Sequence, residues 1–119
     1  MRDFIEAAKA LSDETRLRII NLLLVRECCV CEVMQVLQIS QTRASRNLNV
    51  LLDAGFLKVR REGLWAYYSI HREDLDQFLS LLLDAAEKGL QGNKIAASDR
   101  NRLKKAQSLG PLVCESQVV

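Results

Sequence analysis

The sequence predicts a mainly helical fold that carries one β-hairpin. Apolar residues recur at helical spacing along most of the chain, as in the stripe Val30, Val33, Met34 and Leu37. Residues 57 to 70 instead change to a period of about two and are rich in aromatic and β-favouring side chains, which indicates two strands and a turn. At 119 residues, the chain has the length of one ordinary globular domain.

Four helices are expected before the hairpin. A short one rich in Ala covers residues 2 to 10, and Ser12 or Asp13 caps the next, which contains a long apolar run. The third helix carries the stripe described above. The fourth begins after Ser40, a natural N-cap, and stops at Gly55.

One more helix is expected after the hairpin, followed by a polar segment. Residues 74 to 90 show an apolar stripe so broad that it needs a second covering element, and a second subunit would supply one. Residues 91 to 119 are polar and contain the breaker Gly110-Pro111, so we expect a weak helix and then a mobile tail. The predicted organisation is a folded unit over residues 1 to 90 and an extension over residues 91 to 119.

The fourth helix is the most informative segment, because one side of it is apolar and the other is polar. A short helix, a tight turn, a helix with a polar outer face and a basic hairpin together describe a winged helix-turn-helix, whose second helix enters the major groove of double-stranded DNA. The expected DNA contacts on the helix and the wing are Ser40, Gln41, Thr42, Arg43, Ser45, Arg46, Asn49, Arg60 and Arg61.

Charge and composition narrow the function classes. The segment from Ser40 to Glu62 contains five basic residues and two acidic ones, although the whole chain has a net charge of only +2. We find no apolar run long enough to span a bilayer and no signal peptide, so a cytoplasmic protein without membrane contact is expected. Catalytic Cys-His spacing, a phosphate-binding glycine loop and an acid pair are all missing from the sequence, which argues against an enzyme.

Three cysteines, Cys28, Cys29 and Cys31, stand just ahead of the fourth helix, and a fourth, Cys114, lies near the end of the chain. In a reducing compartment such a cluster favours metal binding or redox chemistry over structural disulfides. If the cluster belonged to a regular helix, Cys28 and Cys31 would be neighbours, whereas Cys29 and Cys31 would project about 160° apart. Binding one ion with the latter pair would then require the first helical turn to unwind.

The segments "LSDETRLRII" and "CVCEVMQVLQISQTRASRNLNVLLDAGFLKVRREGLWAYYSI" and the helix that follows resemble the ArsR/SmtB family of metal-sensing repressors, over about residues 3 to 90. The resemblance implies a homodimer that binds an imperfect inverted repeat in operator DNA and releases it when a metal or metalloid binds. Arsenic sensors of the family carry "CVC", here Cys29-Val30-Cys31, with a further cysteine three residues later, where this chain has Met34.

The expected inducer is therefore As(III), a soft acceptor that prefers three thiolates, and no organic cofactor is expected. Cys28 or Cys114 would supply the third thiolate beside Cys29 and Cys31. Two alternatives of the same fold remain open, namely a thiol redox switch and a repressor that responds to cadmium or lead. Zinc or cobalt sensing through the terminal helix is disfavoured, because residues 74 to 90 contain no histidine.

Overall fold

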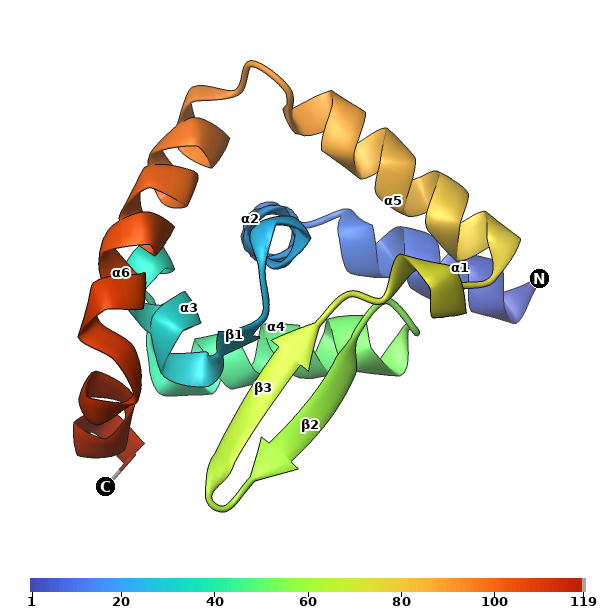
Figure 1. Ribbon diagram of the computed structural model, residues 1–119. Helices are drawn as coiled ribbons and strands as arrows, with labels where there is room; N and C mark the ends of the chain where they lie inside the picture. Colours follow the sequence, from blue (N-terminus) through green and yellow to red (C-terminus); the bar gives the residue numbers. More distant parts are fainter. Residues whose placement is uncertain (119) are drawn as a thin grey trace.

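The computed structural model describes the backbone of residues 1–118 and the side chains of residues 1–106. Figure 1 shows α2 near the centre, with α1 and α5 on one side, α6 on the other, and α4 and the hairpin below. This arrangement confirms the predicted winged helix-turn-helix. The elements are α1 (Arg2–Leu11), α2 (Glu14–Val25), β1 (Cys28–Cys29), α3 (Val30–Leu37), α4 (Gln41–Asp53), β2 (Lys58–Glu62), β3 (Trp65–Ser69), the 3-10 helix η1 (Arg72–Asp74), α5 (Gln77–Leu90) and α6 (Lys94–Val118).

The helix ends are set by the predicted capping residues. The Asp13 carboxylate accepts a hydrogen bond from the backbone N–H of Arg16 at 3.0 Å, and the Ser40 hydroxyl accepts one from the N–H of Arg43 at 3.1 Å. After α4, Gly55 takes a φ of 97°, and a Cβ there would lie 3.1 Å from Cδ1 of Leu79. Glycine is therefore required for both the turn and the close approach of α5.

The hydrophobic core lies between α2 and the two helices of the DNA-binding motif. The α2 side chains Ile19 and Ile20 are fully buried, and they belong to the same cluster as Val33 of α3 and Leu48 of α4. Phe56, the largest fully buried side chain among those described, follows α4 after Ala54 and Gly55. Because α3 and α4 are held by one shared core, the fold fixes the position of α4 relative to the segment that carries the cysteines.

The hairpin belongs to a three-stranded antiparallel sheet in the order β1-β3-β2. The hairpin was predicted, but β1 was not, because a strand of two residues gives no periodic signal. Cys28 pairs with Tyr68 and Cys29 with Tyr67, so the first two clustered cysteines form an edge of the wing sheet.

The polar segment after residue 90 differs from the weak helix that its composition predicts. Helix α6 packs on α2 and α3, where Leu103 and Ala106 are buried. The carboxylate of Asp99 is 2 % exposed and binds the Arg18 guanidinium through two bonds of 2.8 and 2.9 Å. The helix is assigned without a break through Gly110-Pro111, and the mobile tail stays a prediction.

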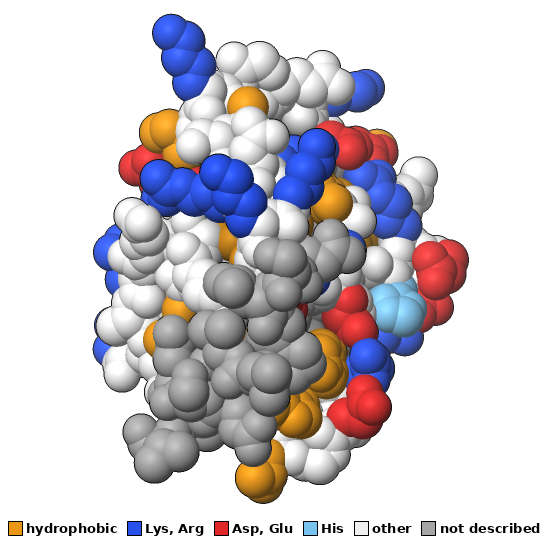
Figure 2. Space-filling view, turned by 60° about the vertical axis from the view of Figure 1, so that its left-hand side comes forward, with side chains coloured by type: hydrophobic (Ala, Val, Ile, Leu, Met, Phe, Trp, Pro, Cys, Tyr) orange, Lys and Arg blue, Asp and Glu red, His pale blue; other side chains and the backbone are white. Residues whose placement is uncertain are grey.

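The polar composition of α6 is concentrated on its outer side. Figure 2, which brings the α6 side of the molecule forward, shows Lys and Arg side chains in blue on this face. The exposed basic residues of the described part of α6 are Lys94, Arg100, Arg102, Lys104 and Lys105. A helix with this surface and a narrow buried stripe has the mean composition of a solvated segment although one face belongs to the core.

Candidate DNA interface and cysteine site

Helix α4 presents the two faces that its sequence predicts. Ala44, Leu48 and Leu51 are fully buried against α2 and α3. The predicted DNA contacts on the opposite side are exposed or half-buried, namely Ser40, Gln41, Thr42, Arg43, Ser45, Arg46 and Asn49. The structure thus leaves this side of α4 open to a partner, as major-groove insertion of this helix requires.

Two polar residues of α4 connect it to α2. The Arg43 guanidinium donates a hydrogen bond to the Thr15 hydroxyl at 2.9 Å, and Arg16 donates one to the side-chain oxygen of Asn47 at 3.1 Å. Asn47 is buried, and the sequence analysis did not single it out. Its position one turn after Arg43 on the buried side was the available signal. Arg43 and Asn47 therefore fix the orientation of the recognition helix on its support.

The two predicted wing arginines differ in their surroundings. The Arg60 guanidinium binds both carboxylate oxygens of Glu27 at 2.7 and 2.9 Å, pairs with Glu62, and lies 4.5 Å from the ring centroid of Tyr67. Arg61 is exposed on the neighbouring position of β2. Sequence reasoning missed Glu27, because the sequence separation of 33 residues from Arg60 hides the pair.

Cys29 and Cys31 lie together. Cys29 has an extended backbone and is the N-cap of α3, which begins at Val30, so its side chain leaves from outside the helix. The two sulfur atoms are 3.7 Å apart. The expectation that these sulfurs project far apart and need an unwound turn is therefore wrong, because it assumed that Cys29 was inside the helix.

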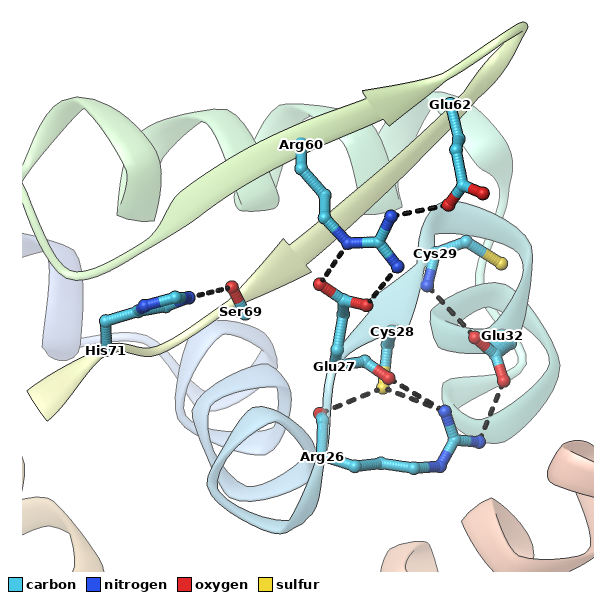
Figure 3. Close-up of polar contacts among 9 residues, drawn as sticks. All are labelled: Arg26, Glu27, Cys28, Cys29, Glu32, Arg60, Glu62, Ser69 and His71. Atoms are coloured by element: carbon cyan, nitrogen blue, oxygen red, sulfur yellow. Dashed lines mark hydrogen bonds and ion pairs between the residues drawn. The ribbon is translucent and has the colours of Figure 1, made fainter.

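Cys28 faces away from this pair. Successive residues of a strand point to opposite faces of a sheet, and Figure 3 shows the Cys28 and Cys29 side chains pointing in different directions. The Cys28 sulfur is buried in the main core, 3.6 Å from the carbonyl oxygen of Arg26. The expected helical neighbour relation of Cys28 and Cys31 is thus also wrong. The side chain of Cys114, the fourth predicted ligand, lies outside the described side chains.

An apolar and partly aromatic wall surrounds the Cys29–Cys31 pair. Both cysteines are buried, and Met34, Trp65 and Tyr67 pack against them. Burial raises the pKa of the Cys29 thiol to about 11 and that of the Cys28 thiol to about 12, since a thiolate loses hydration there. Cys28 and Cys29 are therefore protonated thiols at neutral pH. Met34 packs as an apolar neighbour, as its place in the α3 stripe indicates.

Glu32 organises the backbone at the cysteine pair. Its carboxylate accepts a hydrogen bond from the backbone N–H of Cys29 at 3.0 Å and an ion pair from Arg26 at 2.8 Å, as Figure 3 shows. Glu32 is 8 % exposed and forms a capping box with Cys29. A glutamate three residues after an N-cap is the sequence signal for this role, and it can be recognised only once the helix is known to begin after Cys29.

His71 has a surface role. It exchanges a hydrogen bond with the Ser69 hydroxyl at 3.0 Å and lies near the exposed carboxylates of Glu73 and Asp74. Asp74 is itself paired with Lys58 on the wing. Within residues 1–118, the structure has no helix that is long and apolar enough to cross a membrane.

The fold and the exposed polar face of α4 define a DNA-binding regulator of the winged helix-turn-helix class. Residues 13–59 match the family model of the arsR family of bacterial regulatory proteins. The chain is 38% identical over 96 residues to the arsenic resistance transcriptional regulator ArsR1 of Pseudomonas putida. This alignment covers 76% of this chain and 74% of that protein. It is 33% identical to the arsenical resistance operon repressor of Bacillus subtilis, over 67% of this chain and 77% of that one.

Solved structures agree with these relatives. The homodimeric winged helix-turn-helix DNA-binding domain Mb0332 of Mycobacterium bovis superposes with a TM-score of 0.64 at 29% identity, over 78% of this chain and 82% of that chain. The transcriptional repressor BigR of Xylella fastidiosa gives a TM-score of 0.62 at 25% identity, over 74% and 83%. The chain belongs to the ArsR family of transcriptional regulators.

Proposed function

We propose that the protein is an arsenic(III)-responsive repressor that binds double-stranded operator DNA as a homodimer. As(III) bound by Cys29 and Cys31 releases the DNA. The observation that carries this proposal is the pair of sulfur atoms 3.7 Å apart at the start of the helix before α4. The names of the relatives from Pseudomonas putida and Bacillus subtilis, both arsenic resistance regulators, support the choice of inducer.

The spacing of the pair suits a soft ion. Two thiolates held at about 2.3 Å in a tetrahedral arrangement have their sulfurs about 3.8 Å apart, which is the arithmetic of known zinc-thiolate sites. Cys29 and Cys31 already have this separation, and the aromatic wall excludes water from them. Cys31 is disulfide-bonded in this structure, so the pair binds an ion only after reduction, and adding a third thiolate to the coordination sphere then moves the segment that carries the pair.

The protonation state of Cys29 favours arsenic over divalent cations. At neutral pH, As(III) is the uncharged acid As(OH)₃, and each protonated thiol that binds it forms an As–S bond while its proton leaves with a hydroxide as water. A divalent cation instead needs each thiol to lose a proton to solvent, which burial at Cys29 opposes. Buried thiols thus pose a smaller barrier to arsenous acid than to Cd²⁺ or Pb²⁺.

The third thiolate in this proposal is Cys114 rather than Cys28. The Cys28 sulfur lies in the main core on the opposite face of β1, so it cannot join the pair without breaking the β1–β3 pairing. Cys114 follows the part of α6 that packs on α3, the helix that carries Cys31. Counting the sulfur neighbours of bound arsenic by X-ray absorption in the wild type and in Cys28→Ala and Cys114→Ser variants tests this assignment.

The dimer in this proposal uses α1 and α5. Phe4 and Ile5 on α1 and Leu81 on α5 are 52%, 44% and 61% exposed, and Phe4 packs edge-on against Phe78 of α5. Apolar side chains gathered on two adjacent helices mark an association surface. The Mycobacterium bovis neighbour is named as a homodimer, which supports a second copy as the occupant.

Release follows from the position of the two cysteines. Cys31 belongs to α3, which shares its core with α4, and Cys29 belongs to β1, which pairs with the wing. A ligand that draws these residues and a third thiolate into one coordination sphere stabilises a conformation that differs from the DNA-bound one. DNA affinity then falls by the factor by which the ligand prefers the altered state.

The Cys29→Ser, Cys31→Ser double variant tests the function. We expect it to bind a fluorescent fragment of the protein's own promoter with wild-type affinity, whereas arsenite no longer releases it, because hydroxyls are poor partners for a soft acceptor. Anisotropy under strong reductant measures both properties. Cys28→Ala is the matched control and should retain release. A double variant that arsenite still releases, or a wild type released only by peroxide, would refute the proposal.

Arg46 is expected to read a base, since it is exposed in the middle of the polar side of α4. Arg46→Ala should weaken operator binding by about 1 to 3 kcal/mol and relax the preference at one position of the site. Competition with operator fragments that carry single base changes measures the effect. Unchanged discrimination at every position would show that Arg46 contacts the backbone or no DNA at all.

A further inference from the structure

One row of side chains crosses the wing sheet from the cysteine site to the far strand. In the register of the sheet, Tyr67 on the central strand is the partner of Cys29 on β1 and of Arg60 on β2. Residues that are directly paired project to the same face. Glu27, two positions before Cys29, also reaches this face, since it binds Arg60 (Figure 3), whose guanidinium lies over the Tyr67 ring.

The bonds of this row are well defined. Arg60 holds Glu27 through two parallel hydrogen bonds of 2.9 and 2.7 Å, and its guanidinium covers the Tyr67 ring at 4.5 Å. Planar two-bond pairing of this kind fixes the orientation of both groups, whereas a lysine would hold the same carboxylate as a point charge. The edge strand that carries Cys29 is thereby fastened directly to the far strand of the wing.

The positive charge of Arg60 is neutralised by neighbouring carboxylates. Glu27 and Glu62 both pair with its guanidinium, so the group of three carries a net negative charge. Arg61, the next residue of β2, is exposed and makes a better candidate for a phosphate contact. These observations separate the two wing arginines, which the sequence analysis treated as equivalent.

We propose that Arg60 is a positioning residue that couples the cysteine site to the wing, through its ion pair with Glu27 across Tyr67. When the inducer draws Cys29 out of its place beside Tyr67, the Glu27–Arg60 pair moves the far strand with it, and the wing loses its position on DNA. This inference rests on the proposed function, because the inducer is As(III) bound at Cys29.

The first test needs no inducer. The salt dependence of operator binding counts the phosphate contacts of the protein, and losing one lowers the slope of log affinity against log salt by about 1. We expect Arg61→Gln to lower the slope by this amount and Arg60→Gln to leave it unchanged. A reduced slope in Arg60→Gln would overturn the coupling role, whatever arsenite does.

The second test measures coupling as the ratio of operator Kd values with and without saturating arsenite. We expect Arg60→Gln, Glu27→Gln and Arg60→Lys each to lower this ratio by about tenfold, within the usual range of allosteric coupling. Arg61→Gln should preserve the ratio. The arsenite affinity of the DNA-free protein should stay unchanged in all four variants. The fluorescence of Trp65, the single tryptophan, measures this affinity because Trp65 packs on the cysteine pair.

The outcomes separate this inference from the proposed function. If arsenite releases the wild type and the ratio in Arg60→Gln and Glu27→Gln equals that of the wild type, the coupling role is wrong and the proposed function stands. A wild type that arsenite does not release refutes both. Coupling that survives in Arg60→Lys as fully as in the wild type would show that charge alone suffices, which contradicts the two-bond positioning argued above.

Discussion

Arg18→Ala is expected to lower the free energy of unfolding by about 3 to 5 kcal/mol, the usual cost of leaving one partner of a buried ion pair without the other. The Asp99 carboxylate is 2 % exposed and is held by two bonds from Arg18, which connects α2 to α6. Without the guanidinium, the buried carboxylate loses both of these bonds. Helix α6 would then keep the Asn21 bonds and its buried apolar side as its described attachments to α2.

Urea denaturation of the reduced protein, followed by circular dichroism, measures this loss. Arg72→Ala is the matched control, because Arg72 also makes two bonds to carboxylates, one to Asp84 and one to Glu87, but on the surface. Its loss should cost less than about 1 kcal/mol. The double variant Arg18→Ala, Asp99→Ala should recover part of the stability. Equal losses in Arg18→Ala and Arg72→Ala would contradict the buried role of the first pair.

The second large effect concerns pH. Between pH 6 and 8, arsenite affinity should change little, whereas cadmium affinity should rise by about tenfold per pH unit for the proton that Cys29 must lose. The pKa of Cys29 is raised to about 11 by burial, so this thiol keeps its proton throughout the range. A cation must release each proton to solvent, and higher pH favours that release. Arsenous acid releases water instead, so its binding has no net proton exchange.

Titration of wild-type protein at several pH values, read by Trp65 fluorescence, tests this difference. Cys28→Ala serves as control and should reproduce the wild-type pH profiles for both ligands, because the Cys28 sulfur faces the core. An arsenite affinity that climbs with pH as steeply as that of cadmium would show that the site binds as thiolates. That result would favour a sensor of divalent cations.

The helices and the hairpin could be predicted because each of them has a capping residue or an apolar periodicity within its own segment. Ser40 and Asp13 cap their helices as expected, and the stripe from Val30 to Leu37 is the buried side of α3. The polar side of α4 was equally readable, since helical periodicity places the buried and exposed residues without reference to other elements.

The cysteine geometry could not be read in the same way. Whether Cys29 lies inside the helix or just before it changes its direction completely, and boundaries are the least certain part of a periodic pattern. The pairing of β1 with β3 and the Glu27–Arg60 bond join residues distant in sequence. The burial of Asp99 could not be predicted for the same reason. A carboxylate is expected at the surface unless its ion-pair partner is known, and Arg18 is distant in sequence.

The docking of α6 has a practical consequence for anyone who engineers this chain as a biosensor. A minimal version ending near residue 90 would retain every predicted DNA contact, yet it would expose the sides of α2 and α3 that Leu103 and Ala106 cover. Asn21, buried in α2, would lose its bonds to the carbonyl oxygen of Ala96 and to Arg100. An engineered version should therefore keep the last helix whole.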